Sequence, residues 1–207
     1  MRLYYHPVST CSRRVLMTAR CLEAKVDLVL VDLFKGEQNS PNFLKLNPNH
    51  KVPVLEHDGF VLWESYAIMQ YLADMVPGQT LYPIDTHARA DVNRWLFWCG
   101  QDFMPGIGIL NWENSIKPLI GIGPADPVEV ARGERLLIEA AKVLDTHLDN
   151  RKWICDCGLS LADLAIAAPL ADQNSAKLPV TCLPNLQQWF KQVQALDAWK
   201  STEVGNH

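Results

Sequence analysis

The sequence predicts an α/β domain over residues 1–78 and an all-helical domain over residues 87–207, so the expected fold class is α/β plus all-α. Two observations lead to this prediction. The first ~80 residues alternate short β-type runs with amphipathic runs, whereas the following ~120 carry helical periodicity only. Between the two halves, the segment "GQTLYPIDT" at residues 78–86 contains the glycine and proline that are typical of a linker.

The first half contains five runs whose order defines the expected sheet. They are a strand at residues 2–5, a helix at 12–24, a strand at 26–33, a hairpin at 53–65 and a helix at 65–76. The run "VDLVLVDL" at 26–33 is rich in the β-branched residue valine and is typical of a buried strand. The hairpin turns at Asp58-Gly59, a common two-residue turn signal. The order βαβ followed by ββα predicts a mixed sheet with helices packed on it.

The second half contains four expected helices, at residues 89–103, 127–150, 160–172 and 185–199. The first should be interrupted near Pro105, and the Gly- and Pro-rich stretch 105–127 could be a mobile loop that forms a lip over the site. The third opens with Ser160 and Asp163 at the spacing of a capping box, in which Asp replaces the usual Glu or Gln. Pro169 lies inside this helix and should kink it or end it.

The composition is that of a globular protein, with 48% apolar and 20% charged residues. A formal charge of −4 gives no electrostatic reason to expect a nucleic acid partner. No apolar run approaches the ~20 residues of a membrane span, so no membrane contact is expected. The first residues show no signal-peptide pattern, and a cytoplasmic protein is therefore expected.

The cysteine and histidine spacing does not predict a metal site. The six cysteines are expected to be reduced thiols, because no secretion signal accompanies them. Cys155 and Cys157 form the only close pair, and a C-x-C pair alone is weak evidence for a metal. The six histidines are dispersed, and none lies at zinc-motif spacing from a cysteine pair.

Four segments of the chain carry distinctive motifs: "YYHPVSTCSRRV" at residues 4–15, "NPNHKVPVL" at 47–55, "WESYAIMQYLAD" at 63–74 and "SLADLAIAAPL" at 160–170. Taken in order, these segments resemble the cytosolic glutathione S-transferases of delta, theta and zeta type. The match runs over essentially the whole chain. It implies a thioredoxin-like domain that binds glutathione, a helical domain that forms the site of a small hydrophobic electrophile, and a two-fold homodimer. The last segment matches the folding signature of the family, so Ser160 and Asp163 are expected to be structural.

The resemblance also implies which residues hold glutathione. It makes Val52-Pro53 a cis peptide, with the backbone of Val52 paired to the cysteinyl part of glutathione as an added strand would be. Glu64 and Ser65 take the γ-glutamyl end, since a helix N-terminus with a hydroxyl binds a carboxylate and an adjacent carboxylate binds the ammonium. His50 and Lys51 lie before the proline and are assigned to the glycyl carboxylate.

Without the resemblance, the same residues also fit an edge-strand turn, a helix N-cap and a solvated loop. One position departs from the family pattern. Many delta-like relatives have Arg directly after the Glu-Ser pair, where this sequence has Tyr66. An arginine-based part of the site or of a dimer contact is therefore in doubt.

The reacting group of glutathione is its thiolate, and four side chains from Ser9 to Ser12 could stabilise it. A free thiol has a pKa near 8.5, and lowering this value by ~2 units requires ~2.7 kcal/mol. A hydroxyl that donates to the sulfur, together with the positive end of a helix, supplies energy of that order. Position alone does not separate Ser9, Thr10, Cys11 and Ser12, which all lie where the first helix starts.

Alignment with the family favours Ser9. Without a gap, the catalytic serine of delta-, theta- and zeta-type enzymes falls on Ser9, whereas the cysteine of the beta class falls on Cys11 only with one inserted residue. Cys11 stays the alternative. A helix start beside two arginines is an environment that is expected to lower the pKa of a thiol, so Cys11 could form a mixed disulfide with glutathione. A two-cysteine mechanism is not expected, since Cys11 does not begin a Cys-x-x-Cys motif.

The sequence therefore predicts a glutathione transferase that uses Ser9 and takes glutathione as its co-substrate, without a metal. Trp98 and Phe103 are the candidates for the electrophile pocket. The resemblance to the family implies that Asp102 could meet the glutathione of a neighbouring subunit. Three alternatives stay open: a zeta-like cis–trans isomerase of the maleylacetoacetate isomerase type, a Cys11-based thiol transferase, and a non-catalytic glutathione-binding protein.

Overall fold

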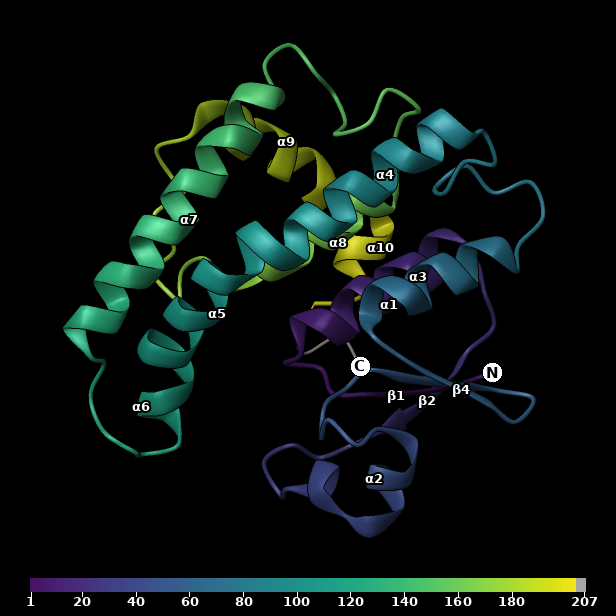
Figure 1. Ribbon diagram of the computed structural model, residues 1–207, viewed down its shortest axis with the longest axis horizontal. Coiled ribbons are helices and arrows are strands. Elements are labelled where there is room, and N and C mark those ends of the chain that lie inside the picture. Colours follow the sequence, from purple (N-terminus) through teal and green to yellow (C-terminus); the bar gives the residue numbers. More distant parts are fainter. Residues whose placement is uncertain (204–207) are drawn as a thin grey trace. The chain divides into compact units, whose positions relative to one another are not determined.

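The computed structural model describes residues 1–203, which form two compact units (Figure 1). The first unit contains Met1–Tyr82 together with the segment that begins at Leu196, and the second contains Pro83–Ala195. The predicted helical domain at 87–207 thus contributes its final segment to the first unit. Residues 204–207 of that prediction lie outside the described residues.

The first unit is built on a four-stranded sheet, as the sequence predicts. Its strands are β1 (Arg2–Tyr5), β2 (Asp27–Leu30), β3 (Val54–His57) and β4 (Phe60–Trp63), in the order β2-β1-β3-β4. Strands β1 and β2 are parallel, whereas β3 pairs antiparallel with both β1 and β4. Its helices are α1 (Thr10–Cys21), α2 (Pro41–Leu46), α3 (Ser65–Asp74) and α10 (Asp197–Lys200). Figure 1 shows α1 and α3 on one face of the sheet and α2 on the other.

The hairpin of β3 and β4 turns at Asp58-Gly59, as predicted. Asp58 has φ 48° and Gly59 has φ 82°, and two positive φ values in succession define the turn type that matches the twist of a hairpin. The expectation of a buried strand at residues 26–33 is wrong for most of its length. Leu28 and Leu30 are 39% and 56% exposed, because β2 lies at the edge of the sheet and pairs only with β1.

The second unit contains helices only among its described residues. The helices are α4 (Thr86–Trp98), a π-helical turn (Cys99–Phe103), α5 (Met104–Asn111), a second π-helical turn (Trp112–Ile116), α6 (Lys117–Leu119), α7 (Pro127–His147), α8 (Leu161–Ala167), a 3₁₀ turn (Ala168–Asp172) and α9 (Pro184–Gln194). The α-helix α8 ends before Pro169, as predicted. No helix in the described part of the chain is long and apolar enough to cross a membrane.

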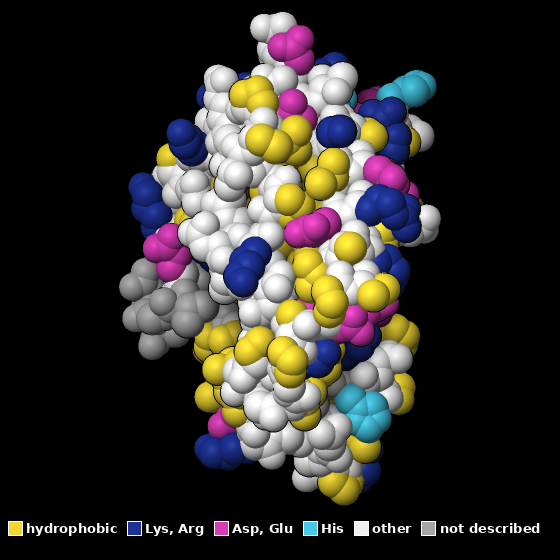
Figure 2. Space-filling model, turned by 90° about the vertical axis from the view of Figure 1, so that its left-hand side faces the viewer, with side chains coloured by type: hydrophobic (Ala, Val, Ile, Leu, Met, Phe, Trp, Pro, Cys, Tyr) yellow, Lys and Arg dark blue, Asp and Glu magenta, His cyan; other side chains and the backbone are white. Residues whose placement is uncertain are grey.

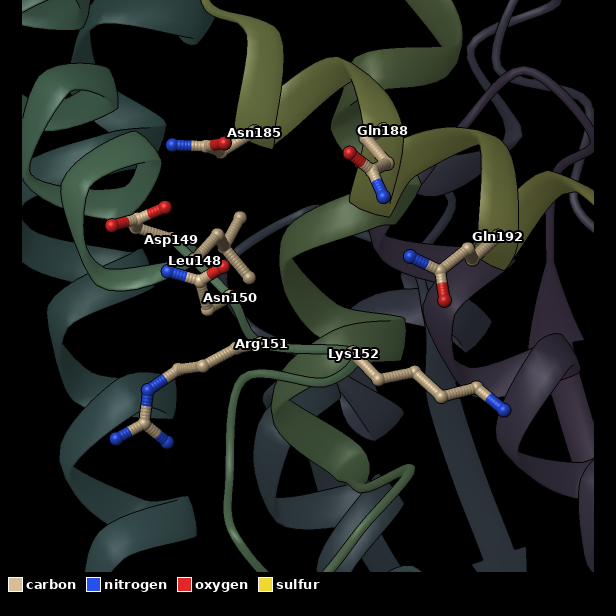
Figure 3. Close-up of a pocket in the computed structure, with 8 residues that line it drawn as sticks. All are labelled: Leu148, Asp149, Asn150, Arg151, Lys152, Asn185, Gln188 and Gln192. Carbon is tan, nitrogen blue, oxygen red and sulfur yellow. The ribbon is translucent and has the colours of Figure 1, made fainter.

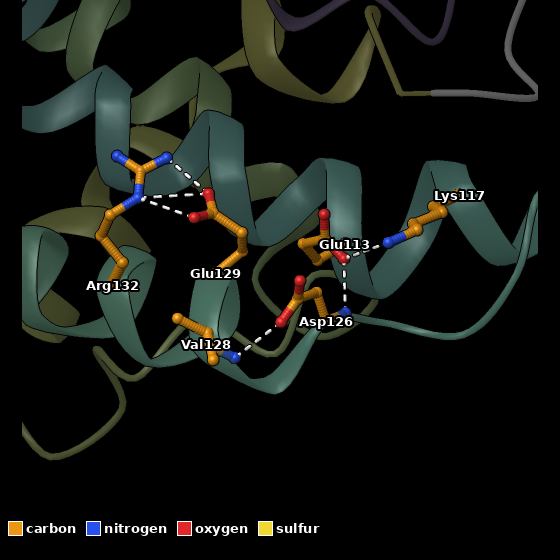
Figure 4. Close-up of polar contacts among 6 residues, drawn as sticks. All are labelled: Glu113, Lys117, Asp126, Val128, Glu129 and Arg132. Atoms are coloured by element: carbon orange, nitrogen blue, oxygen red, sulfur yellow. Dashed lines mark hydrogen bonds and ion pairs between the residues drawn. The ribbon is translucent and has the colours of Figure 1, made fainter.

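The expected loop at 105–127 is instead helical as far as Leu119. Pro105 lies in the first turn of α5, directly after the π-helical turn, where the Met104 N–H bonds to the Cys99 carbonyl. The wider turn accommodates a residue that has no N–H to donate, so the proline does not break the helix. A hydrogen-bonded cluster closes the following connection: Glu113 Oε2 accepts from Lys117 Nζ at 2.9 Å and from the Asp126 N–H at 2.7 Å (Figure 4).

Helices α5 and α7 approach each other closely at two glycines. A Cβ on Gly106 would lie 2.7 Å from the Leu137 backbone nitrogen and 2.9 Å from the Gly133 carbonyl oxygen. Gly133 lies opposite, where a Cβ would meet the side chains of Ile109 and Leu110 at 3.0 Å. Close packing of α5 on α7 therefore requires that Gly106 lack a side chain, whereas a Cβ at Gly133 would press on two neighbouring side chains.

The buried carboxylate of Asp163 ties together three parts of the helical unit. It accepts hydrogen bonds from the Ile154 N–H, the Trp189 indole N–H, and both the N–H and the hydroxyl of Ser160, at 2.8–3.0 Å. Burial raises the pKa of Asp163, while the donated hydrogen bonds oppose that shift. The predicted capping box is present, and Asp163 also anchors the loop before α8 and helix α9.

Apolar side chains are exposed between α6 and the first turn of α7. They are Leu119, Ile120, Ile122 and Val128, with exposures of 49–73%. Helices α6 and α7 lie at the left-hand side of Figure 1, and Figure 2 shows apolar side chains on that side.

Candidate functional site

The sheet register brings three of the predicted segments to one edge of the first unit. Tyr4 of β1 pairs with Val54 of β3, and Val54 pairs with Trp63 of β4, so these three residues form one row across the sheet. Beyond that row, β1 continues to the start of α1, the Val52-Pro53 pair precedes β3, and Glu64 follows β4. The residues predicted from separate motifs are therefore neighbours at one edge of the sheet.

Ser9 is the N-cap residue of α1. Its Oγ accepts a hydrogen bond from the Ser12 N–H at 3.1 Å, and its backbone is extended, with φ −81° and ψ 113°. A serine hydroxyl has one proton to donate, and no residue in the described chain accepts it. The Ser9 side chain is half-buried. Its oxygen is fixed by the hydrogen bond that it accepts, and its hydroxyl proton is available for donation.

The other three candidates at this helix start differ from Ser9. Ser12 is fully buried, and its Oγ lies 3.4 Å from the His6 N–H that donates to it, so this side chain holds the loop before the helix. Thr10 and Cys11 are half-buried at the first two helical positions, and Cys11 is a free thiol. Neither of these two caps the helix.

His6 shapes the loop that carries Ser9, a role that the sequence analysis missed. Its Nδ1 accepts from the Val8 N–H at 3.2 Å, its carbonyl accepts from the Ser9 N–H at 3.0 Å, and its ring packs edge-on against Phe34 at 5.4 Å. Burial lowers the pKa of His6, while the charge of Asp32 opposes this shift. The lowered pKa favours the neutral ring, which the Nδ1 contact with the Val8 N–H requires. The signal in the sequence was a histidine directly before the apolar turn Pro7-Val8.

The Val52-Pro53 peptide bond is cis, as the resemblance implies. Both residues are buried, and among residues 1–203 no backbone hydrogen-bond partner is found for Val52. The preceding loop is held by the buried Asn47, whose side-chain amide donates to the Lys51 carbonyl at 2.7 Å. The backbone polar groups of Val52 are therefore available to an extended ligand lying beside β3.

His50 and Lys51 are both exposed at this loop. His50 has φ 57°, and its Nδ1 lies 2.9 Å from Asn39 Oδ1, which orients the ring. Lys51 makes no side-chain hydrogen bond or ion pair within the described residues. The loop thus presents one oriented imidazole and one lysine ammonium at the surface.

Glu64 and Ser65 lie at the start of α3, as predicted. Ser65 is the first helical residue and is 6% exposed, and Glu64 is the exposed N-cap residue. Glu64 has φ 75° and ψ 109°, a conformation that non-glycine residues rarely adopt, and its side chain does not cap the helix. Strain of this kind costs about 1–3 kcal/mol and is typical of functional sites. The Glu64 carboxylate thus makes no capping hydrogen bond, and the first-turn N–H groups of α3 lack helical partners.

Tyr66, where many delta-like relatives carry arginine, contacts a buried arginine within the same unit. The Arg14 guanidinium carbon lies 4.6 Å from the centre of the Tyr66 ring, and Arg14 is only 1% exposed. A cation therefore lies beneath this helix start, although the sequence lacks the arginine after the Glu-Ser pair.

Trp98 and Phe103 of the helical unit stack on each other, with ring centroids 5.5 Å apart. Phe103 is fully buried, so it belongs to the core of the unit. Trp98 is half-buried and lines two cavities of about 260 and 290 Å³, and the exposed Asp102 lines the first of these.

A larger polar cavity of about 350 Å³ lies elsewhere in the helical unit, beside α9 (Figure 3). It is lined by Leu148, Asp149, Asn150, Arg151, Lys152, Asn185, Gln188 and Gln192, none of which the sequence analysis singled out. In Figure 3 the Arg151 and Lys152 heads point away from each other, so they do not converge on one ligand position. Among residues 1–203, no group of three or more His, Cys, Asp or Glu side chains is placed to hold a metal ion.

Two models of known domains match the chain. One is described as "Glutathione S-transferase, N-terminal domain" and matches residues 1–74, and the other is described as "Glutathione S-transferase, C-terminal domain" and matches residues 118–197. The first match contains the whole edge-of-sheet site, from Ser9 to Ser65.

Solved structures with the same fold cover nearly the whole chain. Glutathione transferase F7 from Populus trichocarpa has a TM-score of 0.89 and 28% identity, covering 100% of this chain and 99% of that chain. A delta-class glutathione transferase from Nilaparvata lugens has a TM-score of 0.84 and 33% identity, with coverage of 99% and 95%. A possible glutathione S-transferase from Rhodopseudomonas palustris has a TM-score of 0.83 and 26% identity, with coverage of 95% and 87%.

Proposed function

The chain belongs to the glutathione S-transferase family and is a glutathione transferase, and from this premise we propose that Ser9 provides its catalytic hydroxyl. In this mechanism the Ser9 hydroxyl donates a hydrogen bond to the sulfur of bound glutathione and stabilises the thiolate. The thiolate then adds to a small hydrophobic electrophile.

The available hydroxyl proton of Ser9 is the observation that carries this proposal. The Ser12 N–H fixes the Ser9 oxygen at 3.1 Å but leaves its donor without an acceptor in the described chain. A hydrogen bond to a charged group contributes about 1.5–3 kcal/mol, and a helix N-terminus adds about 0.3–1 kcal/mol for a nearby anion. Together these reach the ~2.7 kcal/mol that a shift of ~2 units in the thiol pKa requires.

The same edge of the sheet offers complementary groups for the rest of glutathione. We assign the Glu64 carboxylate to the ammonium of the γ-glutamyl end. The Ser65 hydroxyl and the first-turn N–H groups of α3 would take its carboxylate. The unpaired backbone of Val52 would bind the cysteinyl part, and His50 and Lys51 the glycyl carboxylate. These assignments use groups that have no competing partner, apart from the contact of His50 with Asn39.

The second substrate and the assembly are further parts of the proposal. Trp98, which lines cavities in the helical unit, stays our candidate for contact with the electrophile, and the core position of Phe103 gives it a supporting role beneath Trp98. We also propose a homodimer in the cytoplasm, as in the predicted family pattern, with Asp102 as a candidate contact to the neighbouring site.

Cys11 supports a second candidate function. Its thiol is free and half-buried on the first turn of α1, two residues beyond Ser9. Thiolate attack by Cys11 on glutathione disulfide would form a protein–glutathione mixed disulfide and release one glutathione thiolate. That chemistry is thiol transfer rather than addition to an electrophile.

Steady-state kinetics with an activated aryl halide test the proposal. We expect Ser9→Ala to lower kcat/KM for the electrophile by about 10²-fold, the magnitude of a lost shift of ~2 units in the thiolate pKa. Cys11→Ala is the matched control and should retain activity. Release of a glutathione conjugate identifies addition, because an isomerase would return glutathione unchanged. Activity that survives Ser9→Ala but not Cys11→Ala would replace the serine mechanism with the cysteine one.

A further inference from the structure

The final segment of the described chain packs on the helix that carries the candidate catalytic serine. Helix α10 follows the helical unit in sequence but belongs to the first unit, where it contacts α1. Trp199 and Thr202 of this segment are each only 2% exposed. A short helix of four residues is thus held by contacts to the first unit and has little helical stability of its own.

Arg13 makes the contacts between α1 and this segment. Its guanidinium carbon lies 3.9 Å from the centre of the Trp199 ring, its Nη2 donates to the Trp199 carbonyl at 3.3 Å, and its Nε donates to Thr202 Oγ1 at 3.4 Å. Arg13 is only 6% exposed. A buried arginine that both stacks on an aromatic ring and donates through its planar fork is held in one orientation.

Arg13 is also bonded directly to the Ser9 main chain. Its N–H donates to the Ser9 carbonyl at 2.9 Å, which is the first hydrogen bond of α1. The neighbouring Ser12 N–H donates to Ser9 Oγ at 3.1 Å. Both the main chain and the side chain of Ser9 therefore depend on the placement of one helical turn, and Arg13 fixes the far side of that turn to α10.

We propose that Arg13 is a positioning residue, through which Trp199 and Thr202 hold the first turn of α1 and direct the Ser9 hydroxyl at the glutathione sulfur. This inference rests on the proposed role of Ser9. The first turn of a helix lacks several intrahelical bonds and frays readily. A catalytic hydroxyl on such a turn needs external support, because a displacement of about 1 Å can cost about 10²-fold in rate.

If Arg13 positions Ser9, weakening its contacts should change kcat at acidic pH but not the KM for glutathione. Loosening the turn weakens the hydrogen bond from Ser9 to the sulfur, which raises the thiolate pKa and lowers kcat at acidic pH. The groups assigned to the two ends of glutathione lie on the β3 and α3 segments, so the KM for glutathione should change little. A general loss of structure would instead alter both constants.

The experiment measures the thiolate pKa of bound glutathione by ultraviolet absorbance in Trp199→Leu, Trp199→Phe and Thr202→Val. We expect Trp199→Leu to raise this pKa by about one unit and to lower kcat/KM about tenfold at about pH 6.5, with less than a twofold change in the KM for glutathione. Trp199→Phe retains a ring beneath the guanidinium and should recover most of the loss. Lys200→Ala, an exposed change on α10, is the matched control and should resemble the wild type.

Thr202→Val removes the acceptor of Arg13 Nε while leaving the stacked ring, so it tests the same contact if Trp199→Leu does not fold. A wild-type thiolate pKa in both variants, or a KM that rises in proportion to the loss of kcat/KM, would overturn the inference. Ser9→Ala is measured in parallel. If Ser9→Ala leaves the thiolate pKa unchanged, the proposed function fails; if it raises the pKa while the α10 variants do not, only the positioning role fails.

Discussion

At the residue scale, the site is distinguished by polar groups that the rest of the unit does not use. Ser9 has an available proton, the Val52 backbone is unpaired, and Glu64 is held in a strained conformation without capping its helix. Each of these features is costly or neutral for folding alone. Their concentration at one edge of the sheet is what binding of an extended, charged tripeptide requires.

Glu64→Gly separates the strain at this position from its role in binding. Glycine adopts positive φ without strain, so we expect the free energy of unfolding to stay equal or to rise by up to about 1 kcal/mol. The affinity for glutathione should fall at least tenfold, because the carboxylate that we propose to pair with the ammonium is lost. Chemical denaturation and calorimetric titration measure the two quantities.

Glu64→Ala is the control for this prediction, since it removes the carboxylate and keeps the strained backbone. It should lose affinity to the same extent without any gain in stability. Wild-type affinity in both variants would show that the carboxylate does not contact glutathione.

Local sequence patterns predicted the candidate site residues but not the environment of these residues. The short motifs around Ser9, Pro53 and Glu64 were visible because each lies where one element gives way to another. The roles of His6 and Arg13 were not visible, because they depend on contacts with Phe34 and Trp199 that are distant in sequence. Motifs report positions along the chain, whereas burial of a charged side chain is decided by tertiary packing.

At the element scale, sequence periodicity predicted the order of strands and helices, the Asp-Gly turn and the end of α8 at Pro169. It failed where packing altered a regular pattern. The π-helical turn before Pro105 leaves no periodic signal. The run at 185–199 divides into α9 and α10 although its pattern continues. The contacts of Arg13 with Trp199 explain why the last part of that run belongs to the first unit.

The crossing of α5 and α7 leads to a prediction about Gly106. Gly106→Ala places a Cβ 2.7 Å from the Leu137 backbone nitrogen, so the helices must separate. We expect the free energy of unfolding to fall by about 1–3 kcal/mol, as for other overpacked cores. Thermal and denaturant unfolding measure this change.

Gly108→Ala is the matched control on the same helix, because its Cβ would meet nothing within 4 Å. It should stabilise the protein by up to about 1 kcal/mol through helix propensity alone. Equal effects of the two substitutions would contradict the close approach of α5 to α7.

The Glu113 cluster leads to a prediction with a defined pH dependence. The Asp126 N–H and the Lys117 ammonium lower the pKa of Glu113. A lowered folded-state pKa means that the ionised carboxylate stabilises the fold above its unfolded value of about 4.3, and that this contribution is lost as the pH falls through the folded pKa. Glu113→Gln should therefore be less stable than the wild type at neutral pH, and the difference should shrink as the pH falls through the lowered folded-state pKa of Glu113.

Glu129→Gln is the control for this prediction, because Glu129 pairs with Arg132 at an exposed position in the same region (Figure 4). Exposed ion pairs contribute little, so this variant should resemble the wild type across the pH range. Denaturant unfolding followed from acid to neutral pH distinguishes the two variants. A pH-independent loss in Glu113→Gln would mean that packing, and not charge, holds the start of α7.

At the scale of the whole molecule, the chain combines a sheet unit that carries the groups we propose to bind glutathione with a helical unit whose core is held by Asp163. The change of periodicity near residue 80 was enough to predict both. The return of α10 to the first unit was not predictable, because the linker signal occurs only once in the sequence. The family membership identifies the chain as a glutathione transferase, and we propose that its activity depends on the ionisation of glutathione at Ser9.

The most direct test of this account is the pH titration of the ultraviolet thiolate absorbance of bound glutathione in the wild type, Ser9→Ala and Cys11→Ala. We predict a thiolate pKa about two units below the ~8.5 of a free thiol in the wild type and in Cys11→Ala, and a return towards the free value in Ser9→Ala. A lowered pKa that survives in Ser9→Ala and disappears in Cys11→Ala would contradict the serine mechanism.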